Sequence, residues 1–240
     1  MSTFVLVHGA WHGSWCWKRV RTALQRQGHD VYTPTLTGVG ERAHLLDPKI
    51  NLETHIQDVL NLVHWEELED LVLCGHSYAG CVVSGVADRI PGRIAHLVYL
   101  DAFVPETGKS LHDCLPEEQR AIQLDLCVQV GDGWKVPPIP AAVFNVNAVD
   151  RAWVDSQCTP QSLATFQQPV LRTGKPLPPE KVTYVLATGW EGSPFAQFHE
   201  RAQAAGWRSI TLDGGHDLML DRPAEVQQIL LAAAARQGAN

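Results

Sequence analysis

The sequence predicts the α/β class, with a mostly parallel sheet flanked by helices. Short, continuous apolar runs alternate with segments of helical periodicity over both ends of the 240-residue chain. Continuous apolar strands, as opposed to strands of alternating polarity, are typical of a parallel sheet whose two faces are both covered by helices. The length leaves room for one such core with an insertion, or for two small domains.

Each expected strand is a short apolar run bounded by polar or turn-forming residues. The six runs are Phe4–His8, Asp30–Thr33, Leu71–Gly75, Ile94–Leu100, Val182–Thr188 and Arg208–Leu212. Helical segments lie between most of them, marked by capping residues and by apolar positions three or four apart. They are Ser14–Gln27, which ends before Gly28; Leu52–Trp65, which follows Asn51 as N-cap; Cys81–Ala87; and a C-terminal helix that begins at Asp221 with Pro223 in its first turn.

The alternation stops between residues 105 and 180. This stretch holds 10 of the 15 prolines and contains no run typical of a parallel strand. Helical pieces are expected at Pro116–Leu126 and Pro160–Gln168, joined by stiff, proline-rich connectors. We therefore expect residues 1–104 and 181–240 to form one α/β core, and residues 105–180 to form an inserted, largely helical cap.

The composition is that of an ordinary globular chain. Hydrophobic residues make up 45% and charged residues 19%, with a net charge of −7. A nucleic-acid-binding protein would carry a basic face, so that class is excluded. The N-terminal segment lacks the regions of a signal peptide, and no stretch approaches the ~20 apolar residues of a membrane span. The six cysteines form no paired pattern, so we expect reduced thiols. Together with the preceding observations, this favours a cytoplasmic location and no membrane partner. The chain could form a homodimer.

The segment Leu71–Gly80 carries the clearest chemical motif. It consists of a predicted strand, a tight turn that contains Ser77 and the start of a helix. This is the setting of a nucleophile elbow, in which small residues two positions either side of the serine allow a strained turn. Gly75 and Ala79 stand at these positions, so alanine replaces the second glycine of the usual motif.

Two further loops follow strands whose carboxyl ends should lie at the same edge of the sheet. The loop that begins at His8 follows the first strand, where the oxyanion loop of such a sheet belongs. The backbone N–H groups of Ala10 and Tyr78 are therefore candidates for an oxyanion hole. His216 follows the last strand and precedes the C-terminal helix, so it is the candidate general base for Ser77.

The carboxylate that would orient this histidine has two candidates. Glu191 is the only carboxylate in the loop after the strand Val182–Thr188, which is the usual place for the acid. Asp101 stands at the end of the strand Ile94–Leu100, at the same edge of the sheet as Ser77. We favour Asp101, because a carboxylate at the end of a buried strand needs a partner; Glu191 stays as the alternative.

No metal site is expected. His8 and His12 are four residues apart, but no neighbouring carboxylate or cysteine completes a ligand set. Nucleophilic catalysis by a serine, a histidine and an acid requires no cofactor.

These residues together resemble the α/β-hydrolase superfamily, and more narrowly its branch of plant methyl esterases, hydroxynitrile lyases and bacterial carboxylesterases. The segments that carry the resemblance are Phe4–Trp17, Leu36–Gly40, Gly75–Gly80, Val98–Pro105 and Gly214–His216. The resemblance implies the α/β-hydrolase fold for the core, with Ser77 as nucleophile and His216 as base. It also implies that the amides of Ala10 and Tyr78 form the oxyanion hole.

The position of the acid differs within this superfamily. Plant members carry an aspartate in the loop that contains Glu191 here. In relatives such as some haloalkane dehalogenases, the acid follows the strand that matches Ile94–Leu100, which favours Asp101.

The same branch supplies a lyase alternative. Hydroxynitrile lyases of this type have threonine where this chain has Gly9, and lysine where it has Asp217. Without that cation, cyanide would lack its electrostatic stabiliser, so ester hydrolysis is favoured. A weakly hydrolytic ligand receptor and a hydroxynitrile or C–C lyase remain as alternatives.

We therefore expect a serine carboxylesterase that hydrolyses a small apolar or aromatic ester through an acyl-enzyme. Its substrate would lie beneath the cap, against aromatic side chains. The candidates for the pocket wall are Trp11, Phe103, Trp134, Phe144, Trp153 and Phe166.

Overall fold

A single parallel sheet organises the protein. The computed structural model describes residues 1–235, and six parallel strands are ordered β2-β1-β3-β4-β7-β8. The strands are β1 (Thr3–Val7), β2 (Asp30–Tyr32), β3 (Leu71–His76), β4 (Ile94–Leu100), β7 (Val182–Ala187) and β8 (Arg208–Leu212). Each overlaps one predicted apolar run, so the predicted parallel α/β sheet is confirmed.

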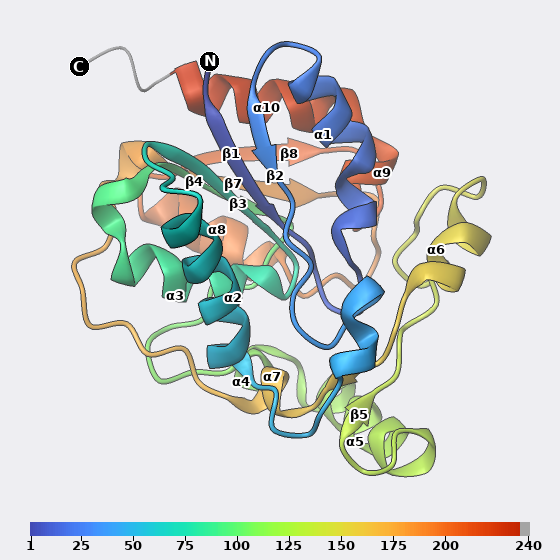
Figure 1. The fold of residues 1–240 in the computed structure, drawn as a ribbon. Coiled ribbons are helices and arrows are strands. Elements are labelled where there is room, and N and C mark those ends of the chain that lie inside the picture. The colour runs from blue at the N-terminus through green and yellow to red at the C-terminus, as the bar shows by residue number, and fades with distance from the viewer. Residues whose placement is uncertain (236–240) are drawn as a thin grey trace.

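Helices cover both faces of this sheet (Figure 1). One face carries α1 (Lys18–Gln25) and α10 (Pro223–Ala235), and the other carries α2 (Leu52–Trp65), α3 (Ala79–Arg89) and α8 (Ala196–Ala204). Every residue of the central strand β3 is consequently buried. Removal of one leucine or valine side chain from water contributes about 1.5–3 kcal/mol, so this double coverage is a main source of stability.

Helix α2 begins and ends where the sequence predicts. Asn51 Oδ1 accepts a hydrogen bond from the Thr54 N–H at 3.1 Å, and Thr54 Oγ1 accepts one from the Asn51 N–H at 3.3 Å. This reciprocal capping box satisfies two backbone donors at the start of the helix. The helix expected from Ser14 is instead divided into a 3-10 turn, Ser14–Trp17, and α1. Another short helix, α9 (Leu218–Asp221), precedes α10, which has Pro223 in its first turn as predicted.

The segment between β4 and β7 contributes no strand to the main sheet and lies beyond the carboxyl ends of its strands (Figure 1). It contains α4 (Leu111–Cys114), α5 (Glu117–Val130), β5 (Lys135–Val136), α6 (Arg151–Gln157), β6 (Gln161–Ser162) and α7 (Ala164–Gln167). The helix expected at Pro116–Leu126 corresponds to α5. The one expected at Pro160–Gln168 is mostly wrong, because Gln161–Ser162 pairs antiparallel with β5 and only α7 is helical.

All six cysteines are free thiols. Over residues 1–235, no helix combines the length and the apolar character needed to cross a membrane.

The capping box gives a prediction about stability. Asn51→Ala removes the acceptor for the Thr54 N–H, so we expect the free energy of unfolding to fall by about 1 kcal/mol. Urea denaturation followed by circular dichroism measures this change. Asn51→Asp, which keeps the acceptor, serves as the control; equal midpoints for Asn51→Ala and the wild type would contradict the role of the cap.

Candidate active site

Ser77 lies on a strained turn between β3 and α3. Its φ is +55°, in the left-handed region that is unfavourable for residues other than glycine. Backbone bonds on both sides hold it there: the Ser77 N–H donates to the Leu100 carbonyl at 3.3 Å, and the Ser77 carbonyl accepts from the Phe103 N–H at 3.1 Å. Gly75 is required at the base of the turn, since a Cβ at that position would lie 2.7 Å from Val83 Cγ2.

His216 and Asp101 form a buried hydrogen bond. The Nδ1 atom of His216, on the loop after β8, lies 2.6 Å from Asp101 Oδ2. Asp101 directly follows β4, has a φ of +43° and is fully buried. Its second oxygen, Oδ1, accepts from the Ala187 N–H at 3.0 Å. The alternative acid, Glu191, is exposed at the rim of the pocket, so the structure brings Asp101 and not Glu191 to the histidine.

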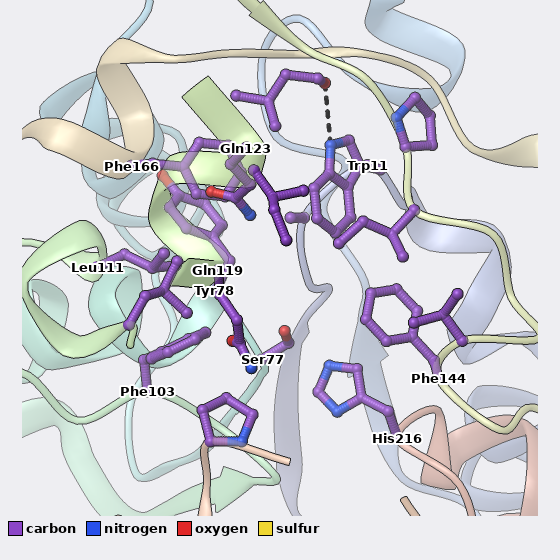
Figure 2. Close-up of a pocket in the computed structure, with 18 of the residues that line it drawn as sticks. Trp11, Ser77, Tyr78, Phe103, Leu111, Gln119, Gln123, Phe144, Phe166 and His216 are labelled. Atoms are coloured by element: carbon purple, nitrogen blue, oxygen red, sulfur yellow. Dashed lines mark hydrogen bonds between the residues drawn. The ribbon is translucent and has the colours of Figure 1, made fainter. Parts of the chain in front are cut away.

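The side chains of Ser77 and His216 face one another across the same pocket (Figure 2). Burial lowers the pKa of His216 to about 4, so the imidazole is neutral at pH 7. With Nδ1–H donated to Asp101, the other ring nitrogen is free of its proton and can accept one. Burial raises the pKa of the Asp101 carboxyl, and the hydrogen bond from Ala187 opposes that shift.

The loop after β1 lies directly against Ser77. A Cβ at position 9 would be 2.9 Å from Ser77 Cβ and 2.8 Å from His76 Nδ1, so only glycine fits without displacement of its neighbours. Ala10, the next residue, lines the pocket together with Tyr78. Neither the Ala10 N–H nor the Tyr78 N–H donates a hydrogen bond to any group in residues 1–235. Two backbone donors are thus available beside the serine.

A buried ion pair behind these groups was missed by sequence reasoning. His12 Nε2 lies 3.0 Å from Asp217 Oδ2, and His12 Nδ1 donates to the Ala10 carbonyl at 2.7 Å. Burial disfavours a charge on His12, yet the Asp217 carboxylate outweighs it and raises the pKa of His12. Burial also disfavours a charge on Asp217, but the contact with His12 outweighs this effect and lowers the pKa of Asp217. The pair links the loop after β1 to the loop that carries His216.

These two residues lie 205 positions apart in the chain. No local motif predicts that His12 and Asp217 are in contact. The one indication in the sequence is that Asp217 stands next to His216. In the part of the chain that the structure describes, no cluster of three or more His, Cys, Asp or Glu side chains could hold a metal ion.

The pocket beside Ser77 has a volume of about 510 Å³ and mostly apolar walls. Its aromatic side chains are Trp11, Phe103, Phe144, Phe166, Trp190 and Phe195, together with the ring of Tyr78. Two glutamines of α5, Gln119 and Gln123, also line it (Figure 2). They were not anticipated, because α5 shows no chemical motif in the sequence.

The placement of Trp153 and Trp134 in the pocket wall is wrong. Trp153 lies on α6, where its ring packs edge-on against Trp15 at a centroid distance of 5.0 Å. Both rings line a separate groove that also contains Lys18 and Arg19. Trp134 does not line the pocket either; Lys135 Nζ lies 5.0 Å from its ring centroid. An aromatic residue in the sequence shows only that it will pack, and not against which partner.

The comparisons with known proteins agree with this architecture. The model of the alpha/beta hydrolase family matches residues 4–229. A carbendazim hydrolyzing esterase of Nocardioides sp. (strain SG-4G) is 46% identical over 243 residues, which cover 97% of this chain and 99% of that protein. Probable esterase PIR7A of Oryza sativa subsp. indica is 36% identical over 123 residues, 51% of this chain and 47% of that protein.

The fold has close counterparts among solved structures. An extracellular alpha/beta-hydrolase from a Paenibacillus species superposes with a TM-score of 0.83 at 24% identity, over 97% of this chain and 99% of that one. At this sequence identity, the structural similarity shows a shared fold and nothing more. Because the family match spans residues 4–229 and the Nocardioides esterase is similar over nearly its whole length, the chain belongs to the alpha/beta hydrolase family and is a carboxylic ester hydrolase.

Proposed function

We propose that this esterase works through an acyl-enzyme, with Ser77 as nucleophile, His216 as general base and Asp101 as the orienting acid. The observation that carries the proposal is the 2.6 Å bond between His216 Nδ1 and Asp101 Oδ2, beside a serine on a strained turn. This bond selects the tautomer in which Nε2 can take the serine proton.

In the proposed first step, Ser77 Oγ attacks the ester carbonyl while His216 Nε2 takes its proton. The N–H groups of Ala10 and Tyr78 stabilise the oxyanion of the tetrahedral intermediate. His216 then protonates the leaving alkoxide, which departs as the alcohol and leaves the acyl group on Ser77. Water, activated by His216, attacks this acyl-enzyme and releases the acid.

In this proposal the buried His12–Asp217 pair has a positioning role. His12 donates to the Ala10 carbonyl, which fixes the peptide group that follows the Ala10 N–H in the oxyanion loop. Asp217 balances the charge of His12 and does not face the substrate, so it does not replace the lysine of the hydroxynitrile lyases. Together with the lack of space for a side chain at position 9, this argues for ester hydrolysis and against the lyase alternative.

We propose small apolar or aromatic esters as the substrate class. Aromatic walls surround Ser77, and residues 105–180, as the cap, supply α5 and Pro137–Pro140 to the pocket. A planar aromatic carbamate ester suits these walls, and the similarity to the Nocardioides esterase makes carbendazim a compound to test first.

The nucleophile is tested with p-nitrophenyl esters of increasing acyl length. Since Ser77→Ala has no oxygen to form the acyl-enzyme, we expect kcat/KM to fall at least about 1,000-fold. Circular dichroism checks that the variant is folded. Undiminished hydrolysis by Ser77→Ala would disprove the mechanism, and a wild type inactive on every ester would favour the receptor alternative.

The acid is tested by comparing Asp101→Asn with Glu191→Gln. The amide introduced by Asp101→Asn cannot hold the imidazole in the productive tautomer, so we expect kcat to fall about 1,000- to 10,000-fold. Glu191→Gln changes an exposed group at the rim and should lower kcat far less. A large loss confined to Glu191→Gln would overturn the assignment of Asp101.

The pH dependence follows from the lowered pKa of His216. Only the neutral imidazole accepts the serine proton, so kcat/KM should stay constant from pH 8 to below pH 6.5 and then fall as the pH decreases through about 4. Initial-rate assays at constant ionic strength measure the profile, with circular dichroism at each pH as the control for unfolding. An acidic limb centred at or above pH 6.5 would contradict a buried, neutral base.

A further inference from the structure

Helix α5 presents two amide side chains to an otherwise apolar pocket. Gln119 and Gln123 are four residues apart, so they lie on one face of the helix, and both line the pocket (Figure 2). Figure 2 places Gln123 beside Phe166, at the end of the pocket away from Ser77. A polar group at that end contacts a part of the substrate remote from the reacting carbonyl.

Two other polar side chains at this end of the pocket, Trp11 and Tyr78, are already bonded within the protein. Trp11 Nε1 donates to the Val136 carbonyl at 3.0 Å. The Tyr78 hydroxyl is hydrogen-bonded to His55 Nδ1 at 2.8 Å. These two aromatic residues therefore offer their rings to a ligand, and at this end of the pocket recognition of a polar atom falls to the glutamines. Trp190 also lines the pocket, but it packs against the ring of His216, and Glu191 is exposed.

The amide of Gln123 is held in one orientation by His112. Its Oε1 accepts a hydrogen bond from His112 Nε2 at 3.1 Å, and the His112 ring stacks on Phe166 at a centroid distance of 6.0 Å. Burial lowers the pKa of His112, so the ring is neutral. With Oε1 engaged, the Nε2 amide group of Gln123 is directed away from His112.

This amide nitrogen has no acceptor among residues 1–235, although only 9% of the Gln123 surface is exposed. The nitrogen is open to the pocket, so solvent satisfies it until a ligand fills this end, and a ligand that supplies an acceptor replaces that hydrogen bond. A hydrocarbon group in the same place would displace the solvent and leave the N–H group without an acceptor, so it would bind more weakly.

We propose that Gln123 is a specificity-determining residue that selects esters with a hydrogen-bond acceptor, a ring nitrogen or a carbonyl oxygen, remote from the ester carbonyl. The inference rests on the proposed function and narrows its substrate class to heteroaromatic or amide-bearing esters and carbamates. His112 acts through Gln123 as a positioning residue.

A matched pair of substrates tests the selection. Methyl quinolinecarboxylates and methyl 2-naphthoate have nearly the same shape, and differ in one ring nitrogen that replaces a C–H group. For the quinoline isomer whose nitrogen reaches Gln123, we expect wild-type kcat/KM to exceed that for the naphthoate by about tenfold, the worth of one hydrogen bond.

Two variants remove the donor in different ways. Gln123→Glu keeps an oxygen for His112 but has no N–H group, and Gln123→Leu is uncharged and similar in size. Both should bring the quinoline-to-naphthoate ratio to about one or below. Gln129→Glu adds the same charge on the exposed side of α5 and serves as the control, which should keep the wild-type ratio.

The outcomes separate this inference from the proposed function. Equal wild-type kcat/KM values for the naphthoate and every quinoline isomer would overturn the role of Gln123, as would a ratio preserved in both Gln123 variants. If the wild type hydrolyses neither ester, the proposed function fails for these compounds. Calorimetric binding of the same esters to Ser77→Ala, and to its double variants with Gln123→Glu and Gln123→Leu, then measures the same ratio without turnover.

Discussion

The parallel pairing of β3, β4 and β7 is the constraint on which the rest of the site depends. His76 pairs with Leu100, and Leu100 pairs with Val185, so these strands end side by side. Ser77 directly follows β3 and Asp101 directly follows β4. The turns at these two positions force both residues into positive φ. Because sheet hydrogen bonds are rigid, they hold strained residues that an isolated loop would release.

Burial decides the charge state of the groups gathered at this edge. His216 is kept neutral by its removal from water, whereas contact with Asp217 raises the pKa of His12 and favours its charged form. His216, which is hydrogen-bonded to Asp101, and His12, which is paired with Asp217, thus have pKa values shifted in opposite directions. Acid and base roles in one site are commonly separated by such differences in environment.

The segment between β4 and β7 completes the pocket, but local sequence patterns predict its secondary structure less well than that of the sheet and its helices. Its prolines stiffen the connections, and its helices are short apart from α5. Sequence periodicity therefore anticipated α5 but misjudged Pro160–Gln168, where two residues pair with β5 instead of joining a helix. It also placed Trp153 in the pocket, although α6 carries that ring to another surface.

The sequence by itself determined the sheet, the bounds of α2 and the turn at Ser77, because apolar periodicity, capping and small residues in a turn act over a few neighbouring positions. It also placed His216 and Asp101 after strands, and the structure brings them together. Only the tertiary structure decided between Asp101 and Glu191, paired His12 with Asp217 and turned Gln123 toward the pocket. Those outcomes depend on packing between segments far apart in the chain, and on burial that changes the charge of a group, neither of which a local pattern reports.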